Sequence, residues 1–274
     1  MLFVALIGVV VGGCAAAELT ESGRLSSYAN LRQSDGLLTK SKFHVDQSAL
    51  LAARSVVIMP TSLDPHASVS GLTGPQLQLV SNSIDRTLCQ QLSARFEVLP
   101  RGRPADLIIQ AVITRLTPTD TTAAGVSVAA GIGGKVVAAA SGIPVPMPRI
   151  PFGLGSLTVE AEAKDATDNQ RAALIWARGA DALTTDARVA EEGDAHTLAS
   201  RFSEDFAKLL VTGSDPIADP TPLLPTAQGI TEYFGGPPKY SACEEFGRDP
   251  GLGDTIGSKI GLPPSWTDDG PTKR

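Results

Sequence analysis

The sequence predicts an α+β fold in which an antiparallel or mixed sheet of about five strands is packed by two amphipathic helices. Short runs rich in β-branched residues, bounded by proline or turn residues, predict the strands. Two longer stretches repeat apolar residues every three or four positions, which is typical of helices that cover a core. Hydrophobic residues make up 42% of the 274 residues, enough for one substantial core.

The chain begins with a segment that has the form of a secretory signal. Leu2–Gly13 is an apolar run of 12 residues, too short for an ordinary membrane-spanning helix. The run ends in Val11-Gly12-Gly13-Cys14, which resembles the bacterial lipobox. We therefore expect a signal peptide over residues 1–13 and a palmitate-type lipid anchor on Cys14. The alternative is a short buried apolar segment with an incidental cysteine.

The residues after Cys14 predict a cellular location and a linker. Ala15 stands where inner-membrane lipoproteins carry a retaining Asp, which by resemblance to enterobacterial sorting favours the outer membrane. We expect a protein on the periplasmic side of that membrane, held through its N-terminal lipid. The following residues are polar and irregular, so residues 14–50 are expected to form a lipidated tether.

The first strand and the first helix have clear boundaries. Arg54–Pro60 is a β-branched run that proline stops, and Thr61–Leu72 is expected to be a loop. Thr73 and Gln76 form a T-x-x-Q capping box at the start of a helix. The apolar stripe of this helix consists of Leu77, Val80, Ile84, Leu88, Leu92 and Phe96.

Four more strands and a second helix complete the predicted core. The strands are expected at Arg95–Pro100, Ala105–Thr119, Ser156–Ala166 and Arg171–Leu183. The third of these alternates cleanly, which places Glu160 and Glu162 on a solvent-exposed face. A helix is expected after Asp194 as N-cap, with an apolar stripe of Ala195, Leu198, Ala199, Phe202, Phe206, Leu209 and Leu210.

An insert between two of these strands is unusually apolar. Gly125–Ile143 contains a single charged residue, Lys135, where a short turn would suffice. The segment is expected to pack on its own sheet, or alternatively to expose an apolar surface that meets the membrane, a second copy or a partner. That possible interaction surface consists of Val126, Val128, Ile132, Val136 and Val137.

The composition changes at Thr212, which divides the α+β domain (residues 51–211) from a tail (residues 212–274). The tail holds 10 of the 20 prolines and 10 of the 27 glycines, and we expect it to be irregular and solvated. Its apolar patches, such as Ile230–Phe234 and Trp266, favour the alternative that it docks on the body or on a partner.

Cys89 and Cys243 are the two cysteines that the predicted lipid anchor leaves over. An oxidising periplasm permits a disulfide between them, and two unpaired thiols are the alternative.

The sequence contains few of the motifs that are typical of catalytic, metal-binding or phosphate-binding sites. The three histidines are scattered singly, and no Gly-x-Ser-x-Gly motif occurs. Gly131–Lys135 imitates a phosphate-binding loop but lacks its first glycine and its final Ser or Thr. We expect no catalytic residue, no bound metal and no cofactor, so the protein is predicted not to be an enzyme. A net charge of −6 without a basic stripe argues against nucleic-acid binding.

Several strings resemble a known bacterial family. SGRLSSYANL after the predicted anchor, RFEVL after the first helix and VEAEAKDATDNQ in a hairpin resemble the lipoprotein family known as domain of unknown function 3313. The tail lies outside that domain, and Ala52-Ala53-Arg54 replaces its common Tyr-Asp-Lys. The resemblance implies an envelope lipoprotein with no assigned reaction. We expect a non-catalytic accessory or interaction subunit of an envelope assembly or, alternatively, a binding module for a lipid or other apolar ligand.

Overall fold

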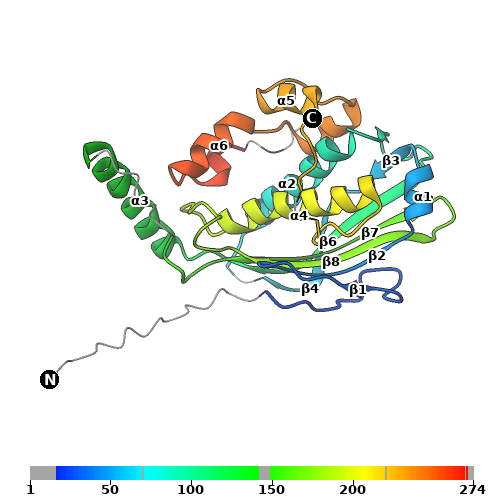
Figure 1. Ribbon diagram of the computed structural model, residues 1–274, viewed down its shortest axis with the longest axis horizontal. Coiled ribbons are helices and arrows are strands. Elements are labelled where there is room, and N and C mark those ends of the chain that lie inside the picture. Colours follow the sequence, from blue (N-terminus) through cyan, green and yellow to red (C-terminus); the bar gives the residue numbers. More distant parts are fainter. Residues whose placement is uncertain (1–16, 70, 142–148, 220, 269, 271–274) are drawn as a thin grey trace.

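A mixed sheet with helices on one face organises the described part of the chain (Figure 1). The computed structural model describes residues 17–69, 71–141, 149–219, 221–268 and 270, without the side chains of residues 132–141. Within these residues the sheet has eight strands in the order β1-β2-β8-β7-β6-β3-β5, with β4 also paired to β6. The strands are β1 (Arg32–Gln33), β2 (Thr39–Val45), β3 (Ser55–Ile58), β4 (Ser62–Val69), β5 (Glu97–Val98), β6 (Leu107–Thr117), β7 (Ser156–Asp165) and β8 (Gln170–Gly179).

The α+β class and the mixed character of the sheet are confirmed. Strands β1, β2, β8, β7 and β6 form antiparallel pairs, whereas β3, β4 and β5 pair in parallel. The helices are α1 (Gln47–Ala52), α2 (Gly74–Leu92), α3 (Thr121–Ser141), α4 (Gly193–Thr212), α5 (Ala227–Tyr233) and α6 (Gly251–Lys259), with 3-10 turns η1 (Ser241–Phe246) and η2 (Pro264–Trp266). The sheet is larger than the five strands predicted, because β1, β2 and β4 join it.

Helices α2 and α4 cover one face of the sheet and bury its core (Figure 1). The predicted capping box of α2 is present, since the Thr73 N–H donates to Gln76 Oε1 over 2.8 Å. Its stripe residues Val80, Ile84 and Leu88 are fully buried. The N-cap expected at Asp194 is wrong by two residues: Glu192 is the N-cap of α4.

The segment expected to be a loop after the first strand is instead strand β4. Its pairing with β6 is interrupted between Leu63 and Ser68. Pro65 lies inside this interruption, so its missing N–H removes no hydrogen bond from a regular ladder. The proline signalled an irregular strand rather than the absence of one.

The N-terminal segment corrects two predictions, because residues 17–31, here called the strap, pack on the outer face of the sheet. The Glu160 carboxylate accepts hydrogen bonds from Ser22 N at 2.7 Å and from the Tyr28 hydroxyl at 2.6 Å. The Glu162 carboxylate likewise accepts from Ser26 N at 2.8 Å. These donors permit both glutamates to be at most 4% exposed, although alternation had placed them in solvent.

The described residues before position 51 therefore do not form an irregular tether. Leu25 is buried against Ala173 and Ile175 on the outer face, and β2 pairs with β8 along its whole length. Regular alternation failed here as a guide to exposure because a distant segment covers the polar face.

The apolar insert forms most of helix α3, which projects from the end of the sheet (Figure 1). The expectation that this insert packs on its own sheet is therefore wrong. Ala123 and Ala124 in the first turn are buried, whereas Val126 is 52% exposed. The described residues contain no helix that is long and apolar enough to cross a membrane.

The described part of the tail packs on the body instead of standing free in solvent. Helices α5 and α6 lie over the outer side of α2 and α4 (Figure 1), and Cys243 and Phe246 of η1 join the main core. The alternative expectation, that the tail docks on the body, describes the structure.

Candidate functional site

A groove of about 630 Å³ lies between the C-terminal turns of α2 and α4 and the first part of the tail. Gln90, Gln91 and Ala94 line it from α2 and the turn that follows, and Val211 lines it from α4. Helix α5, the residues on either side of it and Asp249 form the remaining wall. Here we call this cavity the α5 groove.

The wall contributed by the tail exposes large apolar side chains. Leu224 is 85% exposed, Phe234 is 69% exposed and Ile230 is 49% exposed, and all three line the α5 groove. Burial of such a side chain stabilises a protein by about 1.5–3 kcal/mol relative to leaving it in water. Three of them gathered around one concave surface mark a place where an apolar group would bind favourably.

Local sequence explains why α5 forms at this position. The Thr226 hydroxyl accepts a hydrogen bond from Gly229 N at 3.0 Å and so caps the helix. The helix has only seven residues, too few to be stable alone in water. Contacts with the body must therefore hold it in place.

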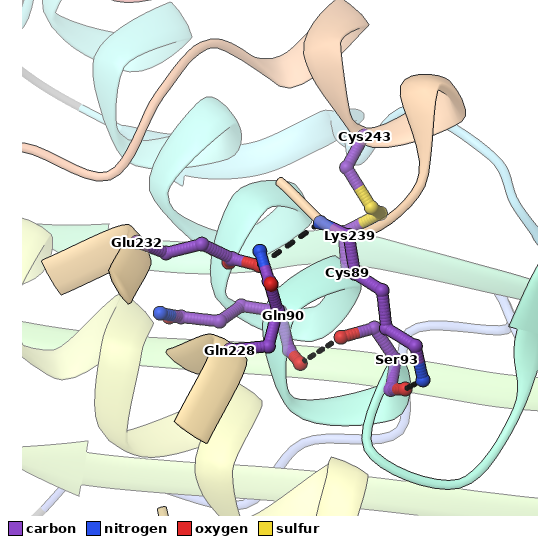
Figure 2. The surroundings of a disulfide bond; sticks show 7 residues. All are labelled: Cys89, Gln90, Ser93, Gln228, Glu232, Lys239 and Cys243. Carbon is purple, nitrogen blue, oxygen red and sulfur yellow. Dashed lines mark hydrogen bonds between the residues drawn. A yellow bond between two sulfur atoms is a disulfide. The ribbon is translucent and has the colours of Figure 1, made fainter. Parts of the chain in front are cut away.

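A disulfide between Cys89 of α2 and Cys243 of η1 attaches the tail to the body ten residues after the end of α5 (Figure 2). The two Cα atoms are 5.8 Å apart, within the normal range for a disulfide, and both side chains are buried. The bridge ties the tail to the helix that lines the groove, so the pairing left open by the sequence is present in the structure.

Polar contacts from the tail surround the disulfide (Figure 2). The Lys239 ammonium donates to Ser93 O at the end of α2 over 2.8 Å, and Lys239 N donates to Glu232 Oε1 over 3.0 Å. Gln228 donates to the same Glu232 oxygen over 3.1 Å. Burial raises the pKa of the Glu232 carboxyl, although these hydrogen bonds oppose the rise. We call Gln228, Glu232, Lys239 and Cys243 the clamp.

Arg95 supplies the cationic side chain of the groove. Its guanidinium donates to Leu50 O at 2.7 Å and to Leu210 O at 3.1 Å in the last turn of α4. A cation is stabilised there by the negative end of the helix dipole. Burial lowers the pKa of Arg95. The carbonyl contacts hold the guanidinium against α4 and give the groove one polar, rigid end.

A second set of polar contacts fixes the end of the tail. Arg86 of α2 forms a two-pronged ion pair with Asp268, and His196 Nε2 lies 3.1 Å from Asp268 Oδ2. Arg188 Nη2 lies 2.8 Å from Oδ1 of Asp254, which belongs to α6. Burial alone would raise the pKa of Asp268, but the His196 hydrogen bond and the Arg86 charge outweigh it and hold that pKa below its usual range. These residues attach α6 and η2 to the body.

The structure describes only some of the site residues that the sequence predicted. Cys14 lies outside the described residues, as do the side chains of Ile132, Val136 and Val137. Val128 packs against Gly261, where an added Cβ would be 2.4 Å from a Val128 methyl. Sequence reasoning missed the α5 groove, although the apolar string Ile230–Phe234 within a polar tail was its signal.

The three histidines lie apart in the part of the chain that the structure describes. His44 lies on β2, His66 lies on β4 and His196 belongs to the contacts that fix the tail. Among the described residues, no three or more His, Cys, Asp or Glu side chains lie together in a way that could hold a metal ion. The α5 groove, with its exposed apolar wall, is the candidate site that the described residues offer.

Comparisons with known proteins point to a family and give little more. Residues 20–206 match the family described as Protein of unknown function (DUF3313). A comparison with curated proteins finds no match.

Two solved structures have similar chains. The PelC dodecamer from Paraburkholderia phytofirmans, in space group P6, is 10% identical, with 68% of this chain and 97% of that chain covered and a TM-score of 0.33. A variant of the same dodecamer in space group C2 is 9% identical, with 66% and 95% covered and a TM-score of 0.32. A TM-score this low does not establish a shared fold.

Proposed function

The chain belongs to the DUF3313 family of proteins of unknown function, and we propose that it is a non-catalytic interaction protein of the bacterial cell envelope. A lipid on Cys14 anchors it to the outer membrane, facing the periplasm. The α5 groove binds an apolar segment of an envelope partner. The anchor rests on the lipobox-like sequence before Cys14, and the binding site rests on the geometry of the tail.

One observation supports the binding role most directly. Leu224, Ile230 and Phe234 stay exposed around a groove, although the same tail buries other apolar side chains in the main core through η1. A tail that only had to cover α2 could turn these three side chains inward as well. Their arrangement around a concave surface fits an apolar group that arrives from outside.

A lipid or another apolar ligand is the second candidate occupant. The volume of about 630 Å³ lies in the range of pockets that enclose small molecules, about 300–1,000 Å³. Arg95 at one end would then lie near the polar part of the ligand. The two candidates differ in the mass of what occupies the groove.

Photocrosslinking in intact cells tests the proposal and separates the candidates. A photoreactive amino acid in place of Ile230 should give a discrete protein adduct of defined mass. The same probe in place of Leu51, which is 54% exposed on α1 and does not line the groove, is the matched control. Phe234→Glu in the Ile230 probe strain should abolish the adduct, because a charge would enter the apolar wall.

The outcomes are distinct. An adduct at Ile230 that is missing at Leu51 and lost in the Phe234 variant supports a protein partner. A mass increase of lipid size at Ile230 supports the second candidate instead. Equal labelling at both positions, or labelling that Phe234→Glu leaves unchanged, contradicts the assignment of the α5 groove as a binding site.

A further inference from the structure

Apolar side chains are also exposed at the end of the molecule where α3 projects. Leu252 and Ile256 of α6 and Ile260, which directly follows the helix, recur at four-residue intervals and are 44%, 54% and 49% exposed. Residues at this spacing share one face of a helix. Trp266, just beyond α6, is 72% exposed, and Val126 of α3 is 52% exposed. We call these five side chains the apolar end.

Helices α3 and α6 are joined at this end. Val128 of α3 packs directly against Gly261, two residues after α6, and Val189 N donates to Gly261 O over 3.0 Å. Both helices lie on the same side of the molecule, away from α1 (Figure 1). The exposed face of α6 and the projecting helix therefore belong to one region of the surface.

The start of the strap lies close to the same end of the sheet. Glu18 Oε2 lies 3.1 Å from Arg115 Nη1 of β6, and α3 begins only six residues after Arg115. Glu18 is four positions after Cys14 in the sequence, so the fully extended chain spans at most about 14 Å between them. An anchor at Cys14 would therefore hold this end of the sheet close to the bilayer.

The composition of α3 suits a lipid surface. Its 21 residues contain one charged side chain, Lys135, and give a helix about 32 Å long. Tryptophan is typical of the boundary between lipid and water, which is where an exposed Trp266 beside α6 would lie. Burying exposed apolar side chains in the interface of a bilayer contributes to membrane binding in proportion to the apolar area that is buried.

We infer that the apolar end is a second membrane contact, which lies in the interface of the bilayer that holds the lipid anchor. This inference rests on the proposed function for the position of the anchor, but the contact itself depends only on the exposed side chains. A second contact adds to the attachment and fixes the orientation of the protein on the bilayer. The α5 groove then remains accessible from the periplasm.

Tryptophan fluorescence measures this contact directly. The lipidated protein is reconstituted in vesicles of phosphatidylethanolamine and phosphatidylglycerol, with or without brominated acyl chains. Trp266 should be quenched by the brominated lipid, whereas Trp176 is fully buried in the core and should not be. The Trp266→Phe variant should therefore lose the quenching. Quenching that persists in this variant, or none in the wild type while the protein stays on the vesicles, would overturn the inference.

A second measurement removes the anchor, so that a failure of lipidation and a failure of this contact can be told apart. The mature chain from Ala15 onward, exported with a cleavable signal, retains every described residue and carries no lipid. The Ile256→Glu variant of this unlipidated chain should partition onto the same vesicles at least about tenfold more weakly than the parent chain. Leu51→Glu, on α1, should leave the partition unchanged. A self-association that Ile256→Glu abolishes, without vesicle binding by the parent chain, would assign the apolar end to a second copy and contradict a membrane contact.

Discussion

Asp85 is a carboxylic acid in the middle of α2 that the core almost completely encloses. It is 2% exposed and accepts hydrogen bonds from Thr61 N at 2.9 Å and from the Thr61 hydroxyl at 2.5 Å. Burial raises its pKa from 3.8 to about 7, although the Thr61 hydrogen bonds oppose the rise. Burial thus favours the protonated form of Asp85, whereas the hydrogen bonds from Thr61, directly before β4, favour the carboxylate.

This raised pKa predicts that the folded protein becomes less stable as the pH rises. As the pH rises from about 4 to about 7, the unfolded chain loses the Asp85 proton while the folded chain keeps it, so the free energy of unfolding decreases by up to about 4 kcal/mol. Asp85→Asn removes this titration. Denaturant titrations at several pH values give the unfolding free energy of the wild type minus that of the variant. This difference should decrease as the pH rises from about 4 to about 7. A difference that stays constant with pH would contradict the raised pKa.

Cys14 is the residue on which the proposed anchor depends. Cys14→Ser removes the thiol that would accept the lipid, so the variant should accumulate as an unprocessed precursor. Intact-mass analysis should show acyl chains on the wild type and none on the variant. Normal processing of the variant together with a wild type that carries no lipid would exclude the anchor.

The tail shows how short elements become stable by long-range attachment. Helix α5 and turn η1 are too short to persist alone, and the clamp and the disulfide hold them on α2. Arg86 and Arg188 hold the later part through Asp268 and Asp254. Groove shape and tail attachment therefore depend on each other, because one wall of the α5 groove is tail.

Loss of the disulfide should loosen that wall. The bridge joins residues 154 positions apart, and the chain-entropy model gives a stabilisation of about 5 kcal/mol for such a loop. The double variant Cys89→Ser/Cys243→Ser should melt at a lower temperature and should lose the Ile230 photocrosslink. Its melting temperature should not respond to reductant, whereas that of the wild type should fall.

Free-thiol labelling checks the bridge itself. In the Cys14→Ser background, the unfolded and unreduced protein should show no reactive thiol. Two labelled cysteines would show that Cys89 and Cys243 are not joined.

The whole molecule has two differentiated ends. Helix α3 follows the end of β6 at which Glu18 of the strap pairs with Arg115, whereas the α5 groove is built on the C-terminal turns of α2 and α4 (Figure 1). An anchored protein with this arrangement would meet the bilayer at one end and offer the groove to the periplasm. With the proposed lipid on Cys14, the strap would fix this orientation, because Glu18 is only four positions after Cys14.

The sequence predicted the parts of this arrangement that depend on local pattern. The capping box at Thr73 and the apolar stripe of α2 are encoded within a few residues and were found. The burial of Glu160 depends on Ser22, 138 residues away, and no periodicity reports such a contact. The docked tail was likewise hidden, since its high proline and glycine content is typical of unstructured chain. The α5 groove exists only once that tail is docked.

Hydroxyl-radical footprinting tests most directly whether the α5 groove is occupied in the cell. Oxidation of Leu224, Ile230 and Phe234 is compared between intact cells and the purified, delipidated protein, with Leu37, which is 98% exposed, as the internal reference. We expect the three groove residues to be protected in cells relative to the purified protein, while Leu37 reacts equally in both. Equal oxidation of the groove residues in cells and in the purified protein would contradict the proposed binding function.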